Sequence, residues 1–230
     1  FSPTGYVGWE MSVPDQTRAD FFLKELKDFE ARAEFPGLTL ICLPNDHTSG
    51  TKPGTPTPAA CVADNDLAFG RIVEALSRSR FWPEMAILAL EDDPQAGWDH
   101  VSGYRTTAYV ISPYAKRKSV VSTHYNTTSI IRTLEQILGL PVMNQFDASA
   151  TPMADCFTET PDFTPFTALA ANIPLDQMNP DPVTITDPLE EALPKLGLAY
   201  FEDLETGEVI CFDTSGSGGA RFTALAKRGE

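Results

Sequence analysis

Three consecutive acids, Glu91, Asp92 and Asp93, follow the short apolar run of residues 86–90 (AILAL). Carboxylates that leave a buried strand together repel one another at neutral pH unless a cation or a basic group lies among them. A metal ion is the simplest way to meet this requirement. Asp92 and Asp93 are therefore candidate metal ligands, and the alternative is that they form a turn or cap a helix after the strand.

Two of the three histidines occupy similar positions in the sequence. His47 follows the apolar run of residues 38–43 (LTLICL), and His100 follows Asp99 in the loop after the acids. Imidazole nitrogens and carboxylate oxygens suit zinc, manganese, iron or magnesium better than copper–thiolate chemistry. Each histidine taken singly is more often structural, but their position with acids at two predicted strand ends favours a joint role in binding a metal or a phosphate.

The residues around these histidines are candidates for binding the substrate. Asn45 and Asp46 directly precede His47, although Asp46 is equally consistent with an ordinary turn. Arg105 is the one cation between Asp99 and Thr107, so it either clamps an anionic substrate or neutralises Asp99.

Helices are predicted in three places along the chain. Apolar residues at helical spacing predict an amphipathic helix that starts near Asp15, which can cap it, and ends before Gly37. A second helix is predicted to begin near Asp64 or Asp66, which we interpret as caps and not as ligands. A third is predicted over about residues 128–138.

Apolar runs at residues 38–43, 86–90 and 107–112 predict strands. The first two lack polar alternation, which is typical of strands buried on both faces of a parallel sheet. Cys42, within the first run, is interpreted as a small buried hydrophobic residue. The alternation of helices and strands from residue 14 to about 141 predicts an α/β domain with a mainly parallel sheet.

The texture of the sequence changes near residue 150. We therefore assign residues 1–150 to the α/β domain and residues 151–230 to a Pro/Thr-rich tail that wraps the surface as extended chain. Two β-rich segments around a turn predict a hairpin near residues 198–213.

The composition restricts the class of protein. The 230 residues include 32 acidic and 17 basic side chains, which gives a net charge of −15. Phosphate backbones bind Lys- and Arg-rich surfaces, so the sequence argues against a nucleic-acid surface. The longest apolar runs are far shorter than the roughly 20 residues of a membrane span.

Four blocks of the sequence resemble a known family over roughly residues 9–180. They read LPNDHTSGTKPGTPTPAACVADNDLAFGRIVEAL, ILALEDDPQAGWDHVSGYRT, YVISPYAKR and THYNTTSIIRTLEQILGLP. These blocks are similar to the phosphoesterase branch of the alkaline-phosphatase superfamily, which also contains bacterial acid phosphatases and phosphatidylcholine-type phospholipases C.

The resemblance implies a doubly wound α/β sheet, flanked by helices, that carries a metal-assisted site for cleaving phosphate esters. In that pattern Asp92 and Asp93 bind a divalent metal ion, which is zinc, manganese, iron, magnesium or calcium. His47 and His100 bind a second metal or contact the phosphate oxygens as catalytic residues, with a phosphate ester as substrate. Relatives are often exported, which suggests a periplasmic or secreted protein.

Two departures from the family pattern affect this interpretation. The family pattern has a His at the position of Tyr104 in this chain. If that His is a metal ligand, the metal site of this chain is weakened by its replacement with Tyr104. The pattern also places the first acidic ligand and a Ser or Thr nucleophile before the part that resembles residues 9–50. We therefore expect a carboxyl-terminal part of the enzyme, which an amino-terminal portion would complete, and the nucleophile is unknown. The alternative is a noncatalytic metal-binding or structural module that keeps the fold without the nucleophile.

Overall fold

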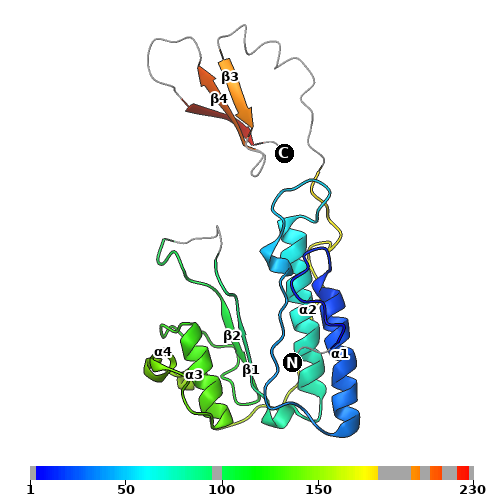
Figure 1. Ribbon diagram of the computed structural model, residues 1–230, viewed down its shortest axis with the longest axis vertical. Helices are drawn as coiled ribbons and strands as arrows, with labels where there is room; N and C mark the ends of the chain where they lie inside the picture. Colours follow the sequence, from blue (N-terminus) through cyan, green and yellow to red (C-terminus); the bar gives the residue numbers. More distant parts are fainter. Residues whose placement is uncertain (1–3, 95–99, 181–197, 203–207, 214–221, 228–230) are drawn as a thin grey trace. The chain divides into compact units, whose positions relative to one another are not determined.

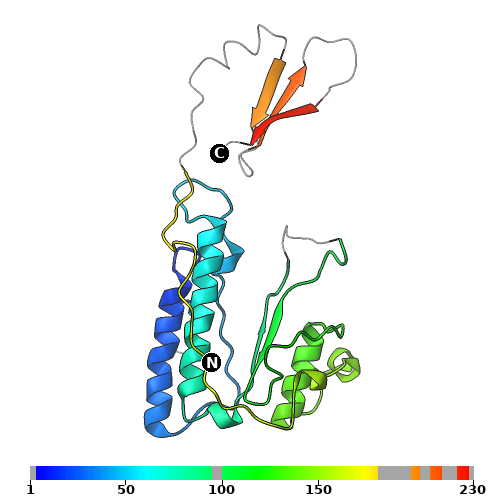
Figure 2. The same ribbon diagram turned by 180° about the vertical axis from the view of Figure 1, so that it is seen from behind.

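The computed structural model describes residues 4–94 and 100–180, together with the backbone of three strands between residues 198 and 227 (Figures 1 and 2). The chain separates into two compact units, each described here by itself. Unit 1 comprises residues 1–23, 41–72 and 168–230, and unit 2 comprises residues 24–40 and 73–167. Among the described residues, no helix is both long enough and apolar enough to cross a bilayer.

Helix α1 (Asp15–Arg32) confirms the first predicted helix. Two of the apolar positions that predicted it are buried in the structure, with exposures of 3% for Phe22 and 4% for Leu26, and the third, Phe29, is half-buried. Asp15 is the first residue of α1 and not the residue before it. Its carboxylate accepts a hydrogen bond from the backbone N–H of Asn45 (3.0 Å). Asp15 therefore connects the start of α1 to a segment 30 residues further along the chain.

Helix α2 (Pro58–Arg78) begins earlier than the sequence predicted. Thr57 precedes the first turn, and its hydroxyl oxygen accepts a hydrogen bond from the backbone N–H of Ala60 (3.2 Å). Pro58 follows at the first helical position, where its missing N–H has no cost. The prediction that Asp64 or Asp66 caps this helix was therefore wrong, because both lie inside it.

Strands β1 (Ile87–Leu90) and β2 (Ala108–Ile111) form the sheet of unit 2. Both strands were predicted, but they pair antiparallel, with Ile87 opposite Ile111 and Leu90 opposite Ala108. The fold is thus a mixture of helices and strands, consistent with the α/β class, and the pairs in the described sheets are antiparallel where the sequence had predicted a mainly parallel, doubly wound arrangement.

The predicted strand at residues 38–43 was wrong. The segment forms no described strand, and Leu40 is 84% exposed. Cys42 is also exposed, which contradicts its interpretation as a buried residue. A strand is buried on both faces only when it pairs with neighbouring strands and helices cover both faces of the sheet. In the described part of the chain, no strand pairs with residues 38–43.

Helices α3 (Thr127–Leu138) and α4 (Gln145–Ser149) follow β2 in unit 2. The third predicted helix is confirmed as α3. Asn126 caps its start by accepting a hydrogen bond from the backbone N–H of Ser129, and Gly139 ends it in the left-handed region at φ 66°. Helix α4 was not predicted, because five residues are too few to show a helical period.

Within the predicted tail, residues 157–180 form no described helix or strand. A short 3₁₀ helix (Ala154–Cys156) precedes this stretch. Within unit 2 this stretch is attached by a bridge between Ala115 and Phe157. Within unit 1 the buried Asn179 donates its side-chain amide to the backbone oxygens of Gly50 (2.9 Å) and Lys52 (3.1 Å).

A small antiparallel sheet contains the end of the described chain, in the order β3-β4-β5. Its strands are β3 (Leu198–Glu202), β4 (Glu208–Asp213) and β5 (Phe222–Lys227). The pairing of β3 with β4 confirms the predicted hairpin. Strand β5 was not predicted.

Candidate functional site

A short turn in unit 1 carries three of the predicted site residues. Residues Asn45–His47 form a 3₁₀ helix. Asn45 is buried, and its side-chain amide donates to Asp64 Oδ2 (2.7 Å). Asp46 is half-buried and His47 is exposed. The structure therefore gives Asn45 a structural partner, and its predicted contact with a substrate stays a prediction.

The imidazole of His47 lies against the indole of Trp9. The ring centroids are 5.2 Å apart and the rings meet edge to face at 83°. Nδ1 of His47 lies 3.2 Å from the carbonyl oxygen of Thr48, whose own backbone is in the left-handed region at φ 61°. Edge-to-face contact restricts the ring's orientation while leaving its outer edge accessible.

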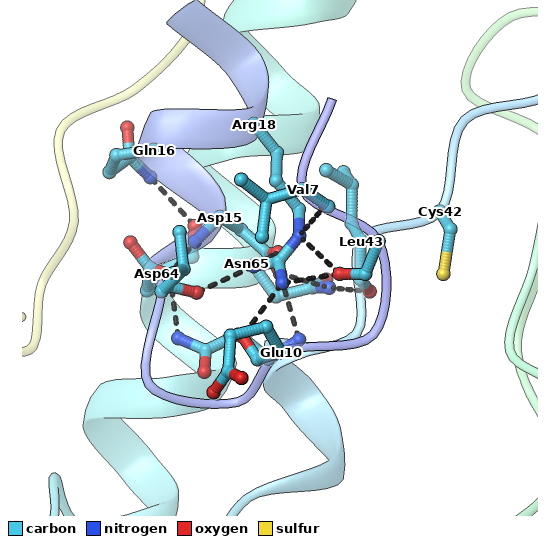
Figure 3. A network of polar contacts seen from close by, with 12 residues as sticks. Val7, Glu10, Asp15, Gln16, Arg18, Cys42, Leu43, Asp64 and Asn65 are labelled. Atoms are coloured by element: carbon cyan, nitrogen blue, oxygen red, sulfur yellow. Dashed lines mark hydrogen bonds and ion pairs between the residues drawn. The ribbon is translucent and has the colours of Figure 1, made fainter. Parts of the chain in front are cut away.

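A buried polar cluster supports this turn, and the sequence analysis did not find it (Figure 3). It consists of Asp15, Arg18, Asp64 and Asn65, with Asn45 as its link to the turn. The exposures of Asp15, Arg18 and Asp64 are 0%, 1% and 3%. Such burial of charged side chains is uncommon without partners. The available signal was the position of Asp64 and Asn65 inside an apolar helical stripe, which becomes visible only once the true start of α2 is known.

Desolvation is the main electrostatic effect in this cluster. Burial raises the pKa of the Asp15 carboxyl, and this outweighs the lowering by hydrogen bonds from Asn45 and Asn65 and by the charge of Arg18. The nearby Asp64 carboxylate adds to the increase. Of the two acids, Asp15 pairs with the guanidinium of Arg18 (3.1 Å), and Asp64 accepts its hydrogen bonds from the backbone N–H of Asp15 and the side-chain amide of Asn45.

The predicted metal ligands lie in unit 2, where β1 ends. Glu91 continues the pairing of the two strands, since its backbone N–H donates to the carbonyl oxygen of Thr107 (3.2 Å). The Glu91 carboxylate accepts a hydrogen bond from the hydroxyl of Thr107 (3.2 Å). Asp92 and Asp93 follow as exposed residues, and Asp92 Oδ1 accepts a hydrogen bond from the backbone N–H of Asp93 (3.0 Å).

His100 and Arg105 lie on the same connection between β1 and β2. Because these strands are antiparallel, the end of β1 and the start of β2 are at the same end of the sheet. Both residues are exposed, and the backbone N–H of Arg105 donates to the carbonyl oxygen of Ser102 (3.3 Å). Tyr104, which was expected to stand where the family pattern has a His, is 87% exposed. Asp99 lies outside the described residues.

These residues are the predicted part of a metal site, and that assignment stays a prediction. Asp92 and Asp93 supply hard oxygen donors at an exposed position, and zinc, manganese, magnesium and calcium all bind carboxylate oxygens. However, no group of three or more His, Cys, Asp or Glu side chains gathers around one point within the described residues. The structure brings Asp92, Asp93, His100 and Arg105 onto one connection, while His47, Asn45 and Asp46 belong to the other unit.

Comparison with known proteins finds a family match in the middle of the chain. Residues 56–141 match the family model described as the phosphoesterase family, consistent with a member of that family. This match confirms the predicted resemblance to the phosphoesterase family over these residues. The matched segment contains Asp92, Asp93, His100 and Arg105, whereas Asn45, Asp46 and His47 precede it. A comparison with curated proteins found no match.

Proposed function

We propose that this chain supplies part of the metal and phosphate site of a metal-dependent hydrolase that acts on phosphate esters, as a phosphatase or phosphodiesterase. The observation that carries the proposal is the phosphoesterase match over residues 56–141. That match spans both adjacent acids at the end of β1 and the loop that leads into β2.

The roles follow from the chemistry of each side chain. Asp92 and Asp93 offer carboxylate oxygens to a divalent ion, with His100 as a further ligand or a phosphate contact. Arg105 offers a guanidinium to the phosphate oxygens, a geometry that favours two parallel hydrogen bonds. When bound, the ion neutralises charge on the phosphoryl group.

In unit 1, considered by itself, we propose a role for His47. Its exposed imidazole, held against Trp9, is available to contact a metal or a phosphoryl oxygen. Asn45 and Asp46 are proposed substrate neighbours in the same turn. The nucleophile is not assigned to a residue.

Calorimetric titration with Mn²⁺ or Zn²⁺ tests the metal site directly. We expect the chain to bind the ion, and we expect Asp92→Asn and Asp93→Asn each to weaken binding by at least about tenfold, because a carboxylate ligand becomes a neutral amide. Asp66→Asn is the matched control, since Asp66 is an exposed acid on α2 that also lies within the matched segment. Equal affinities in all four proteins would contradict the assignment.

A phosphatase assay with a chromogenic phosphate ester tests the reaction. In an active form of the protein we expect Asp92→Ala to lower kcat/KM by at least about 100-fold while Asp66→Ala leaves it unchanged. Metal binding without turnover in the chain by itself would favour a partial site. The absence of both would favour the alternative, a noncatalytic structural module.

A further inference from the structure

Two buried carboxylates in unit 1 lie next to each other without forming part of the proposed metal site. Asp64 Oδ2 accepts a hydrogen bond from the backbone N–H of Asp15 (2.6 Å), which brings the start of α1 against the middle of α2 (Figure 3). The two residues are 49 positions apart in the sequence. Their carboxylates are therefore fixed by the fold and not by local sequence.

The hydrogen bonds of these carboxylates converge on the turn that carries His47. The backbone N–H of Asn45 donates to Asp15 Oδ2 (3.0 Å), and the side-chain amide of Asn45 donates to Asp64 Oδ2 (2.7 Å). Asn65 donates to the carbonyl oxygen of Leu43 (2.8 Å) and to Asp15 Oδ2 (3.1 Å). Residues 43–45 are thus held at three points, two residues before His47.

Arg18 extends the same cluster to the segment that carries Trp9. It pairs with Asp15 (3.1 Å), and its guanidinium also donates to the carbonyl oxygens of Gly8 (2.7 Å) and Glu10 (2.8 Å). Trp9 lies between these two residues and contacts His47. Both the backbone before His47 and the backbone on either side of Trp9 are therefore held by one cluster.

The composition of the cluster favours a positioning role over a purely stabilising one. Removing two carboxylates and a guanidinium from water carries a large desolvation penalty, and apolar residues of similar volume often stabilise a fold equally well. A charged cluster defines the geometry of its members, because hydrogen bonds form only within a narrow range of distances and angles. In this chain the cluster bonds to Asn45 and to the residues on either side of Trp9, and His47 lies next to both segments.

We propose that Asp15 and Asp64 are positioning residues, which hold the Asn45–His47 turn and the Trp9 segment so that the His47 ring has one orientation. The inference rests on the proposed function, in which His47 contacts the metal or the phosphoryl group. It adds to that function two residues that act through another side chain.

Nuclear magnetic resonance of the histidine rings tests the positioning itself, independently of activity. In the wild-type chain we expect Trp9→Leu to shift the His47 Hε1 resonance, because the indole lies against the imidazole. In an Asp64→Ala background the same substitution should shift it far less. Asp66→Ala is the control, because it removes an exposed acid from the same helix. A folded Asp64→Ala protein that keeps the full effect of Trp9→Leu would overturn the proposal.

Asn45→Ala provides a milder second variant if Asp64→Ala does not fold. It removes the amide that donates to Asp64 but keeps the backbone N–H that donates to Asp15. We expect an intermediate loss of the Trp9 effect on the His47 resonance. No loss in this folded variant would count against the proposal in the same way.

Kinetics in an active form of the protein separate this inference from the proposed function. We expect Asp64→Ala to lower kcat/KM by about tenfold or more, since small misplacements of a reacting group have large effects on rate. The His47→Gln/Asp64→Ala double variant should be no slower than His47→Gln alone, because both changes remove one interaction. If the losses of kcat/KM in the two single variants multiply in the double variant, the positioning role of Asp64 would be overturned. An unchanged rate in His47→Gln would overturn the role of His47 in the proposed function, whereas the resonance experiment would still decide the positioning.

Discussion

The Asp147 carboxylate gives the clearest pH-dependent behaviour of a single residue. It is 1% exposed and accepts hydrogen bonds from the backbone N–H groups of Met143 (2.7 Å), Asn144 (2.9 Å) and Ala148 (3.0 Å) at the start of α4. Burial by itself raises the pKa of Asp147, but the interaction with the Glu135 side chain and the hydrogen bonds from these N–H groups lower it to about 2.

This lowered pKa predicts a loss of stability in acid. An aspartate with a folded pKa of about 2 and an unfolded pKa of about 3.9 stabilises the fold above pH 4, and this contribution is lost as the pH falls towards 2. We therefore expect Asp147→Asn to be less stable than the wild-type chain at pH 6, with a difference that shrinks between pH 4 and pH 2.5. Urea unfolding at these pH values measures it.

A second variant is the control for the loss of one negative charge in Asp147→Asn. Asp66→Asn makes the same change at an exposed position of α2 in a chain of net charge −15. The explanation fails if Asp147→Asn lowers the free energy of unfolding equally at pH 6 and pH 2.5.

At the scale of elements, the start of α2 depends on the hydroxyl of Thr57. This hydroxyl accepts a hydrogen bond from the backbone N–H of Ala60, and the backbone N–H of Thr57 donates to the carbonyl oxygen of Gln177 (2.9 Å). We expect Thr57→Ala to lower the free energy of unfolding by about 1 kcal/mol. Thr57→Ser keeps the oxygen and loses the same methyl group, so it should retain most of the stability in urea unfolding. Equal losses in the two variants would show that the methyl group, and not the cap, is responsible.

The elements also show which sequence signals were sufficient. Helices α1 and α3 were predicted because their apolar residues recur over several turns, and α3 also carries caps at both ends. The start of α2 was missed because Thr57 and Pro58 lie in a loop rich in Pro, Gly and Thr, where a cap is hard to distinguish from a turn. The run at residues 38–43 has the composition of a buried strand, but composition does not supply the neighbouring strands that bury it.

At the scale of the whole molecule, contacts between distant segments were beyond prediction. The connection after β1 carries the acids that suggested a metal, and local chemistry was enough to find them. The direction in which β1 and β2 pair depends on tertiary contacts. The apolar runs of the sequence therefore could not decide between a parallel and an antiparallel sheet. The cluster of Asp15 and Asp64 joins positions 49 residues apart. Each acid by itself is an ordinary helix residue, and only the folded chain makes them a pair.

Metal binding provides a prediction for the molecule as a whole, because a ligand that binds only the folded state stabilises it. If Asp92 and Asp93 bind Mn²⁺, free metal at 100 times its Kd adds about 2.7 kcal/mol, which raises Tm by roughly 5–10 °C in a chain of this size. The net charge of −15 complicates the measurement, since any added salt screens repulsion among the acids. Melting curves should therefore be recorded at constant ionic strength.

Two double variants separate the specific effect of the metal from the general effect of charge. Asp92→Asn/Asp93→Asn removes the proposed ligands, and Asp66→Asn/Asp176→Asn removes the same charge from two other exposed acids. We expect Mn²⁺ to raise Tm in the wild-type chain and in the second double variant but not in the first. An equal increase in all three proteins would mean that the ion acts on the overall charge, and the proposed metal site at the end of β1 would then be wrong.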